Sequence, residues 1–302
     1  MTAKHAFMII AHDQFDLLKI LITMLDDERN DIYVHVDSKA QDFNADEFVS
    51  LTKHAGLFFT DRISVTWGDY SQIEAEMILL KAAVKNEINR NRYAYFHLLS
   101  GCDLPIKTND EIHRFFAEHQ GKEFIHFSED EPSRSAMSRV RYYHIFRSNR
   151  NLFYKILAQF ALMAQKILGV NRLKNEPINV WKGTNWFSIT DDFANYVVSK
   201  ESEIKKIFSY SYCCDEVFLQ TIFMNSPFKD RLYMPHCNNN QLACARYIDW
   251  QRGNPYTFTS EDFESIISSP AMFARKFSMH LDKEIVYKIR DYIGDKVNEQ
   301  QT

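Results

Sequence analysis

The sequence predicts an α/β protein built on a mostly parallel central sheet with helices on its faces. Residues 5–11 form a compact apolar run, residues 14–25 carry apolar side chains at helical spacing, and residues 31–36 form a second, β-branched run. A helical pattern at 69–88 and an aromatic-rich strand pattern at 93–99 repeat this order. Parallel neighbouring strands need a crossover connection, so the alternation indicates a parallel sheet.

Two further elements follow, and no boundary separates them from the rest. Residues 107–120 are expected to form a helix capped by Thr108 or Asn109, and residues 122–127 another strand. The sequence contains no internal repeat, no low-complexity segment and no Pro/Gly-rich linker. We therefore expect a single domain over residues 1–302.

Composition restricts the class of partner. The chain has 302 residues and a hydrophobic content of 45%, enough to bury a large core. Its net charge of -4 and pI near 6.3 provide no global field that would attract nucleic acid. Local cations must therefore hold any anionic ligand, and we expect a small-molecule partner and no nucleic acid.

Cysteine usage and the N-terminus favour a cytoplasmic chain. The five cysteines have no regular spacing and form no Cys-x-x-Cys pair, which argues against a disulfide framework and against a zinc site. The N-terminus runs directly into a short apolar segment without a cleavage-site pattern, and no apolar stretch is long enough to span a bilayer. We expect neither a signal peptide nor a transmembrane helix.

The middle of the chain, residues 129–170, changes character. Its first part carries arginines among serines and aromatic residues: Arg134, Arg139, Arg141, Arg147 and Arg150. That part is either a flexible basic segment near an anionic ligand or a solvated loop. Residues 151–170 predict a helix with few charges, which lies either on a membrane surface or against the core. Packing against the core is the favoured expectation.

Ligands of crossover sheets bind beyond the carboxyl ends of the strands, and three stretches fall there. Asp37 ends the second predicted strand, where a carboxylate suits ribose hydroxyls, unless it only caps a turn. Trp67 offers an aromatic wall for a planar base, although a tryptophan is more often part of the core. The third stretch is Ser100 to Asp103.

A group-transfer enzyme with a nucleotide-activated donor must hold the base and the ribose of the nucleotide. It must also stabilise the diphosphate that leaves. The usual device is a divalent metal held by an Asp-x-Asp pair, but the strand end at 100–103 contains a single carboxylate. We therefore expect no metal cofactor, with fixed cations in its place. Lys276 stands out because phenylalanines flank it at 273 and 277. The second cation is expected to be one of Arg246, Arg252 and Arg275.

Glu216 is the candidate catalytic base. Apolar residues follow it, and it is expected in the first turn of a helix over 215–225. A carboxylate in that position can accept the proton of an acceptor hydroxyl, but Asp-Glu at a helix start is also ordinary capping and dipole matching. An aromatic turn containing Gly183 lies upstream at 181–188, as a sugar-transferring site needs.

Ordered motifs extend this pattern over residues 5–280. They are Tyr33–Lys39, Val65–Gly68, Leu98–Thr108, Trp181–Phe187, Cys214–Glu216, Arg246–Trp250 and Phe273–Phe277. Together they resemble the core-2/I-branching glycosyltransferase family, which groups β-1,6-N-acetylglucosaminyltransferases with peptide O-xylosyltransferases. The block at 99–108, Leu-Ser-Gly-x-Asp-x-Pro-Ile-Lys-Thr, is the most specific of these motifs.

The resemblance implies a GT-A (Rossmann-like) fold and an inverting, metal-independent transfer. The donor would be a UDP-sugar, with N-acetylglucosamine favoured, and the acceptor a hydroxyl of a glycan or glycolipid that becomes β-linked. The expected parts are a donor-binding half at 1–127, a helical insertion at 129–170 and an acceptor and catalytic half at 175–302. The alternatives are a UDP-xylose-dependent enzyme and a non-catalytic carbohydrate- or membrane-binding relative.

The resemblance also implies roles for single residues. Glu216 matches the base that deprotonates the acceptor. The expected donor contacts are Asp37, Trp67, Asp103, Arg252 and Lys276. The expected acceptor contacts are Arg141, Trp186 and Trp250. Residues 253–256, next to Arg252, depart from the pattern of the branching enzymes.

The resemblance also bears on localisation. Animal members of the family are disulfide-rich and Golgi-anchored, and this sequence shows neither feature. We therefore expect a soluble bacterial member that acts in surface polysaccharide or glycoconjugate synthesis. Peripheral association with the inner face of the membrane is a further expectation.

Overall fold

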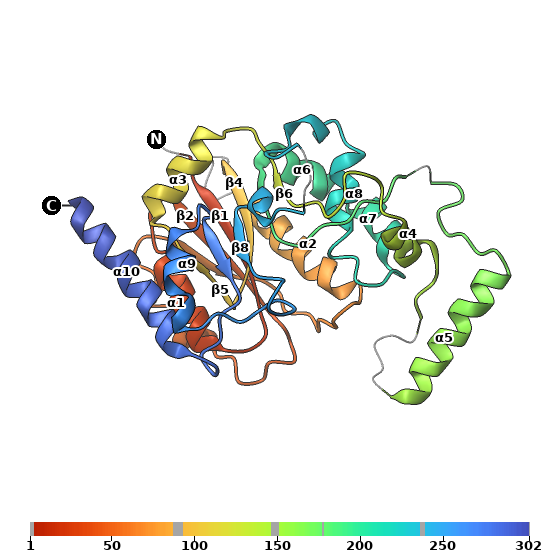
Figure 1. Cartoon of the computed structure of the whole chain (residues 1–302), viewed down its shortest axis with the longest axis horizontal. Helices are drawn as coiled ribbons and strands as arrows, with labels where there is room; N and C mark the ends of the chain where they lie inside the picture. Colours follow the sequence, from red (N-terminus) through yellow and green to blue (C-terminus); the bar gives the residue numbers. More distant parts are fainter. Residues whose placement is uncertain (1–2, 87–92, 146–150, 177, 236–238, 302) are drawn as a thin grey trace.

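A computed structural model describes residues 3–86, 93–145, 151–176, 178–235 and 239–301. Its centre is a six-stranded sheet with the order β3-β2-β1-β4-β7-β6 (Figure 1). These strands are β1 (His5–Ala11), β2 (Asn30–Val36), β3 (Gly56–Phe59), β4 (Tyr95–Ser100), β6 (Phe124–Ile125) and β7 (Phe187–Thr190). The first four are parallel, and β7 runs antiparallel to both of its neighbours. The predicted α/β class with a mostly parallel sheet is confirmed.

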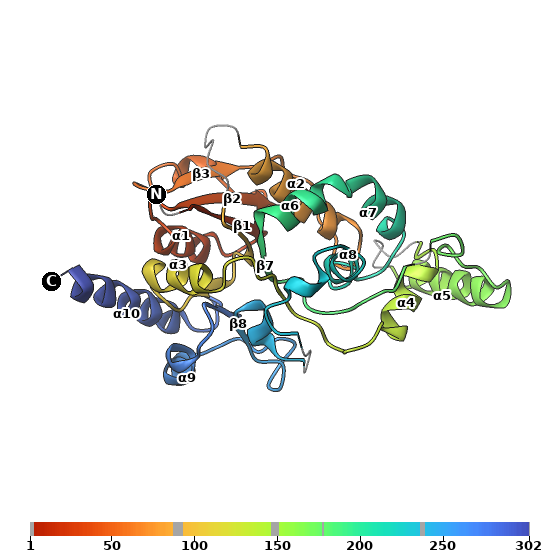
Figure 2. The ribbon, with the colours of Figure 1, turned by 90° about the horizontal axis from the view of Figure 1, so that it is seen from above.

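Helices cover both faces of this sheet (Figure 2). One face is packed by α2 (Ser71–Val84), α6 (Asp191–Ser199), α7 (Glu201–Phe208) and α8 (Phe218–Met224). The other is packed by α1 (Phe15–Met24), α3 (Asn109–Glu118), α9 (Phe263–Ser268) and α10 (Lys283–Gln301). Side chains alternate along a strand, so Met8 of β1 enters the first core and Ile9 enters the second.

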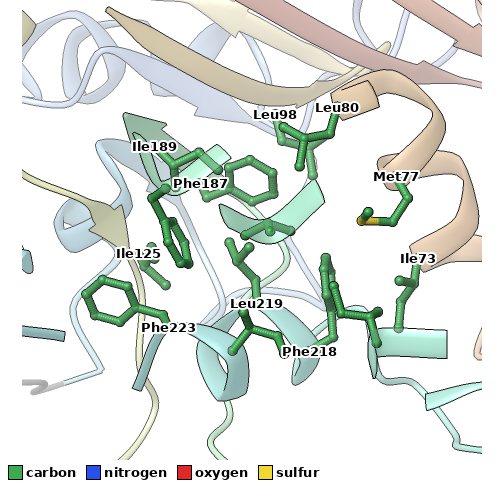
Figure 3. Close-up of a cluster of buried hydrophobic side chains, with 14 of the residues drawn as sticks. Ile73, Met77, Leu80, Leu98, Ile125, Phe187, Ile189, Phe218, Leu219 and Phe223 are labelled. Carbon is green, nitrogen blue, oxygen red and sulfur yellow. The ribbon is translucent and has the colours of Figure 1, made fainter. Parts of the chain in front are cut away.

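The first core packs against α8. Figure 3 shows Met77 of α2, Leu98 of β4, Phe187 of β7 and Phe223 of α8 among its buried side chains. Each of these side chains is almost completely buried. The start of α8 is therefore held against the sheet by apolar packing, and the turn that precedes α8 takes its position from that packing.

A second, three-stranded sheet has the order β5-β9-β8. Its strands are β5 (Asp103–Pro105), β8 (Arg246–Ile248) and β9 (Phe273–Arg275). Strand β5 follows β4 after a short turn, so the chain passes from one sheet to the other at the carboxyl end of β4. The described chain also contains short 3₁₀ helices: η1 (Ala45–Glu47), η2 (Lys229–Arg231), η3 (Gln241–Cys244) and η4 (Ser260–Asp262).

Buried Arg246 joins the two sheets. It begins β8, and its guanidinium donates hydrogen bonds to the carbonyl oxygens of Leu98 in β4 (3.0 Å) and Phe187 in β7 (2.8 Å). Residues 95–97 of β4 pair with residues 188–190 of β7, so the guanidinium takes over where this pairing ends. Burial lowers the pKa of Arg246 to about 10. Because its side chain is buried and engaged, our expectation that Arg246 is a candidate diphosphate ligand is wrong.

Most predicted elements are present, with shorter bounds. Thr108 caps α3, and a capping box joins it to Glu111, as the sequence pattern predicts. The strand predicted at 122–127 retains only β6, and residues 87–88 of the predicted 69–88 helix lie outside the described residues.

The middle segment differs from expectation. The stretch interpreted as a flexible segment or solvated loop contains α4 (Arg134–Arg141), whose N-cap Ser133 accepts a hydrogen bond from the backbone of Ala136. Arg147 and Arg150 lie outside the described residues. The predicted helix that follows is α5 (Leu152–Ile167), and Ala158 is its one buried residue. The expectation that this helix packs against the core is therefore wrong.

We predict that Arg246→Met destabilises the protein by about 3 kcal/mol or more. The substitution leaves the buried carbonyls of Leu98 and Phe187 without their donor, and each unsatisfied group costs about 1–3 kcal/mol. Equilibrium denaturation in urea measures the change. Arg290→Met, on the exposed side of α10, is the control, with an expected change of about 0.5 kcal/mol or less. Equal effects of the two substitutions would contradict the role of Arg246.

Candidate active site

Glu216 lies in a turn immediately before α8. The backbone N–H of Phe218 donates to the carbonyl oxygen of Cys214 at 2.8 Å, which closes the turn. The helix itself begins at Phe218, so Glu216 is not in its first turn as predicted. The Glu216 side chain is 37% exposed. Its carboxylate is thus held on a packed element yet remains open to a substrate.

Two cations face this carboxylate. Arg139 Nη1 of α4 lies 3.1 Å from Glu216 Oε2 and also donates to the carbonyl oxygen of Cys213 at 3.2 Å. Lys182 Nζ lies 3.9 Å from the same Oε2 atom. The side chain of Glu216 is therefore oriented from two sides by α4 and by the loop at 181–186.

Gly183 allows that loop to approach the turn. Its backbone N–H donates to the carbonyl oxygen of Glu216 at 2.9 Å. A Cβ atom at position 183 would lie 1.8 Å from the carbonyl oxygen of His126, a distance that no side chain tolerates. The sequence pattern identified this turn, and its glycine is required by the close approach of two backbone segments.

The Trp67 turn is tied to the same place. The Cys213 N–H donates to the carbonyl oxygen of Gly68 at 3.0 Å. Gln72 accepts from the Gly68 N–H, and its Nε2 donates to Asp215 Oδ2 at 2.8 Å. Trp67 is 74% exposed, so the alternative interpretation of Trp67 as a core tryptophan is wrong. Its ring is free to contact a ligand beside Glu216.

Buried carboxylates lie behind the exposed one. Burial and the neighbouring Glu216 raise the pKa of Asp215 to about 7. Burial, together with Asp215, raises the pKa of Glu76 on α2 well above its usual range. Asp215 and Glu76 are both inside the protein, whereas Glu216 is at its surface. Of these three carboxylates, Glu216 is the one that solvent can reach.

Asp37 lies at the carboxyl end of β2, as predicted. Its Oδ1 accepts from the Lys39 N–H at 2.9 Å, and its Oδ2 is 3.4 Å from Lys39 Nζ. Lys39 Nζ also donates to the carbonyl oxygen of Val65, two residues before Trp67. This bridge places the two predicted uridine contacts, Asp37 and Trp67, on adjoining loops.

Asp103 and Trp186 meet through an arginine. Asp103 accepts from the Ser100 N–H at 2.8 Å and from Arg275 Nη1 at 2.6 Å. The Arg275 guanidinium carbon lies 4.2 Å from the centre of the Trp186 ring, which is buried. Asp103 and Trp186 thus hold Arg275 at the carboxyl end of β4.

Lys276 follows Arg275 directly. Within the described part of the chain it forms no ion pair, and the carbonyl oxygen of Lys276 accepts from the Phe258 N–H at 2.9 Å. The nearby Phe277 N–H donates to the carbonyl oxygen of Cys102 at 2.9 Å. The Lys276 ammonium therefore remains available beside the strand end at 100–103.

The two ends of the site are close. Gly183 contacts Glu216, and Trp186 contacts Arg275, next to Lys276. Three residues of extended chain span at most about 11 Å, so the loop at 181–186 brings the candidate base and the candidate cations to one edge of the sheet.

The predicted residues after β8 lie in a separate turn. Asp249 Oδ1 accepts from the backbone N–H of Arg252 at 3.0 Å, and Trp250 between them is half-exposed. The Arg252 side chain already pairs with Asp249 and with Asp262 Oδ1 at 2.7 Å. Arg252 would have to leave two carboxylates to bind a diphosphate.

Arg141, the predicted acceptor contact on α4, is not the arginine that contacts Glu216. Arg141 is exposed at the end of α4, whereas Arg139 reaches Glu216. Residues two apart on a helix point in different directions, and the sequence did not show which of them faces the site. The arginine-rich composition was the available signal for Arg139.

Possible metal ligands are not gathered at one place in the described residues. Among residues 3–86, 93–145, 151–176, 178–235 and 239–301, no three His, Cys, Asp or Glu side chains cluster as metal ligands would. The metal independence expected from the sequence stays a prediction.

Comparisons with known proteins identify the family of the chain. The model of the Core-2/I-Branching enzyme family matches residues 5–268. Xylosyltransferase 2 of Rattus norvegicus is 25% identical over 303 residues, which cover 93% of this chain and 32% of the relative. Xylosyltransferase 1 of Homo sapiens is 23% identical over 304 residues, with 95% and 30% covered. The chain thus spans about a third of the length of the curated relatives it matches.

The chain has a weak likeness to one solved structure. Mouse xyloside xylosyltransferase 1 aligns with a TM-score of 0.39 and 11% identity, covering 91% of this chain and 97% of that chain. This likeness is too low to support a conclusion on function.

The class of protein follows from the sheet, the site and the family match. A carboxylate, nearby cations and an exposed tryptophan lie at the carboxyl edge of a parallel sheet, where crossover sheets bind their ligands. The chain belongs to the Core-2/I-Branching enzyme family, and the predicted family is confirmed.

We predict that Asp215→Asn makes stability less dependent on pH. The pKa of Asp215 is raised from 3.8 to about 7 in the folded state, so folding takes up a proton between these values. The wild type therefore loses stability as pH rises from about 4 to 7. The variant should gain about 2–4 kcal/mol relative to the wild type over that window.

Urea denaturation at pH 4, 6 and 8 measures this difference. Asp42→Asn, at an exposed position, is the matched control. A difference between Asp215→Asn and wild type that does not change with pH would contradict the assignment of a buried, protonated Asp215.

Proposed function

We propose that this protein is an inverting, metal-independent glycosyltransferase that moves a sugar from a UDP-sugar to a hydroxyl of a glycan or glycolipid acceptor. The observation that carries the proposal is the exposed carboxylate of Glu216, held between Arg139 and Lys182, at the same sheet edge as Lys276. Family membership supports sugar transfer, and the residue arrangement supports the mechanism.

Glu216 acts as the general base. The acceptor hydroxyl gives its proton to the Glu216 carboxylate while its oxygen attacks the anomeric carbon from the face opposite the diphosphate. The bond from that carbon to the diphosphate oxygen breaks, and its electron pair leaves with UDP. One displacement inverts the anomeric centre, so an α-linked donor gives a β-glycoside.

Lys276 stabilises the departing diphosphate. A fixed ammonium group compensates developing negative charge in the way a divalent cation would. Arg275 lies beside it but is paired with Asp103, so its guanidinium serves mainly to hold the strand end. Lys276 therefore carries most of the expected interaction with the leaving group.

Asp37 and Trp67 bind the nucleoside. Their loops adjoin through Lys39, which places a carboxylate for ribose hydroxyls near an exposed aromatic wall for uracil. Trp67 lies next to the Glu216 turn through Gly68 and Cys213. The donor would thus extend from these loops toward Glu216 and Lys276.

The two predicted acceptor tryptophans differ in availability. One face of Trp186 is occupied by Arg275, and its side chain is buried. Trp250 is half-exposed and offers its ring to solvent. A sugar ring would therefore stack on Trp250, while Trp186 supports Arg275.

The donor sugar has two candidates. N-acetylglucosamine is expected from the branching enzymes of the family, and xylose is favoured by the names of the relatives, which are xylosyltransferases. A thermal-shift screen with UDP-N-acetylglucosamine and UDP-xylose distinguishes them, because the bound donor raises the apparent stability by mass action. A non-catalytic relative would bind a donor without turnover.

The acceptor would belong to a surface polysaccharide or glycoconjugate pathway of a bacterium. We propose a cytoplasmic enzyme that works at the inner face of the membrane. A glycolipid acceptor there would be reached by a chain that binds the membrane surface peripherally.

We predict that Glu216→Gln lowers the transfer rate by about 10³-fold, because the amide cannot accept the acceptor proton. The affinity for UDP should stay within about twofold, since the side chain does not contact the nucleotide in this mechanism. Product formation and calorimetry with UDP measure the two quantities. Glu28→Gln, exposed and remote in sequence, is the control. Retained turnover in Glu216→Gln would overturn the base assignment.

We predict that Lys276→Ala weakens UDP binding by about tenfold or more, because a charge-assisted contact to the diphosphate is lost. Calorimetry in EDTA measures the affinity, with exposed Lys283→Ala as the control. Wild-type binding and transfer should be the same in EDTA as with Mn²⁺. Unchanged affinity in the variant would show that another cation holds the diphosphate, and a strict Mn²⁺ requirement would exclude the metal-independent mechanism.

A further inference from the structure

Helix α5 presents a continuous apolar face to solvent. Its large exposed side chains recur every three or four residues: Phe153, Ile156, Phe160, Met163 and Ile167. This spacing places them on one side of the helix. Phe160 is 66% exposed and Ile167 is 76% exposed, and Leu152 and Leu168 extend the same face at its two ends. A soluble surface rarely leaves so many large apolar side chains together without a partner.

The opposite side of α5 is attached to the protein. Ala158 is buried there, and Gln165 forms two hydrogen bonds with the backbone of Tyr143, at 2.7 and 2.9 Å. Arg172, just beyond the helix, donates to the carbonyl oxygen of Arg141 at 3.0 Å through its backbone N–H. The orientation of the helix is thus set by polar contacts, and its apolar face points away from them.

Helix α5 also lies at one end of the molecule. Figures 1 and 2 both show it beyond α4, at the end opposite the C-terminal helix α10. Its apolar face is therefore accessible to a large, flat partner.

Charge indicates what that partner is. The sequence from Pro132 to Asn175 contains lysines and arginines but no Asp or Glu, although the whole chain has a net charge of -4. Lys155 and Lys166 lie on α5 itself and are exposed. Cationic side chains beside an aromatic and aliphatic face are the pattern of helices that lie in the interface of an anionic membrane.

The length of α5 suits a helix on a membrane surface better than a helix that spans a membrane. None of the helices in the described ranges is long and apolar enough to cross a bilayer. Helix α5 has 16 residues with lysines near both ends, which suits a helix lying in the plane of the surface.

We infer that α5 docks this protein on an anionic lipid surface, with Phe153, Phe160 and Ile167 entering the interface and Lys155 and Lys166 contacting the headgroups. Helix α4 connects the candidate active site to α5. Arg139 of α4 contacts Glu216. The carbonyl oxygen of Arg141, at the end of α4, accepts a hydrogen bond from the backbone N–H of Arg172 just beyond α5. Docking is independent of sugar transfer, so each can fail without the other.

Vesicle co-sedimentation of the full chain tests this inference. The vesicles are phosphatidylcholine alone or phosphatidylcholine mixed with phosphatidylglycerol, and no donor is present. The wild type should bind the mixed vesicles at least about tenfold more tightly than the neutral ones, and salt should weaken the binding.

The apolar face is tested by the triple variant Phe153→Ser/Phe160→Ser/Ile167→Ser. All three side chains are exposed, so circular dichroism and thermal unfolding should match the wild type, while vesicle binding falls by about tenfold or more. The matched control Val49→Ser/Leu281→Ser removes exposed apolar side chains elsewhere and should bind as the wild type does.

The charge contribution is tested by Lys155→Glu/Lys166→Glu, which should lose the preference for phosphatidylglycerol. Lys53→Glu/Lys283→Glu makes the same change in net charge at other exposed positions and should keep it. Failure of the wild type to bind mixed vesicles, or equal binding by the triple variant, would overturn the inference. A wild-type dimer that the triple variant abolishes, seen by sedimentation without vesicle binding, would assign the face to a second copy of the chain and would also overturn it.

Discussion

The architecture of the site depends on the hydrogen bonds that the buried guanidinium of Arg246 donates to two strands. At the carboxyl end of the sheet, β4 and β7 stop pairing with each other, and Arg246 binds the carbonyl oxygens of Leu98 and Phe187 instead. The arginine belongs to β8, so the same side chain holds the small sheet against the large one. The loops of the candidate site follow at this end of β4, where Asp103 and Arg275 pair.

Those loops meet through backbone contacts more than through side chains. Gly183 donates to Glu216, Cys213 donates to Gly68, and both contacts require segments to approach without an intervening side chain. Gln72 adds a bridge from the Trp67 turn to Asp215. The Trp67 turn and the Glu216 turn are therefore connected by several hydrogen bonds, and a substitution at a contact glycine would disturb both.

Sequence patterns located much of the fold and part of the site. The strand at His5–Ala11 and the capping box of α3 follow from local periodicity and local hydrogen bonding, which the sequence contains in full. The exposure of Trp67 and the pairing of Arg139 with Glu216 do not, because each depends on a segment distant in the chain. Helix α5 has the composition of a core helix, and only its position shows that its apolar face is exposed and not packed against the rest of the described chain.

The sequence by itself determined the α/β class, the order of the motifs, the family and the choice of Glu216 as the candidate base, because these follow from short-range patterns. The tertiary structure decided which arginine is buried, which one contacts Glu216 and which tryptophans are exposed. The physical reason is that burial and charge pairing depend on distances between remote segments. Arg139, Arg246 and Arg252 have the same side chain, and their surroundings alone give them different roles.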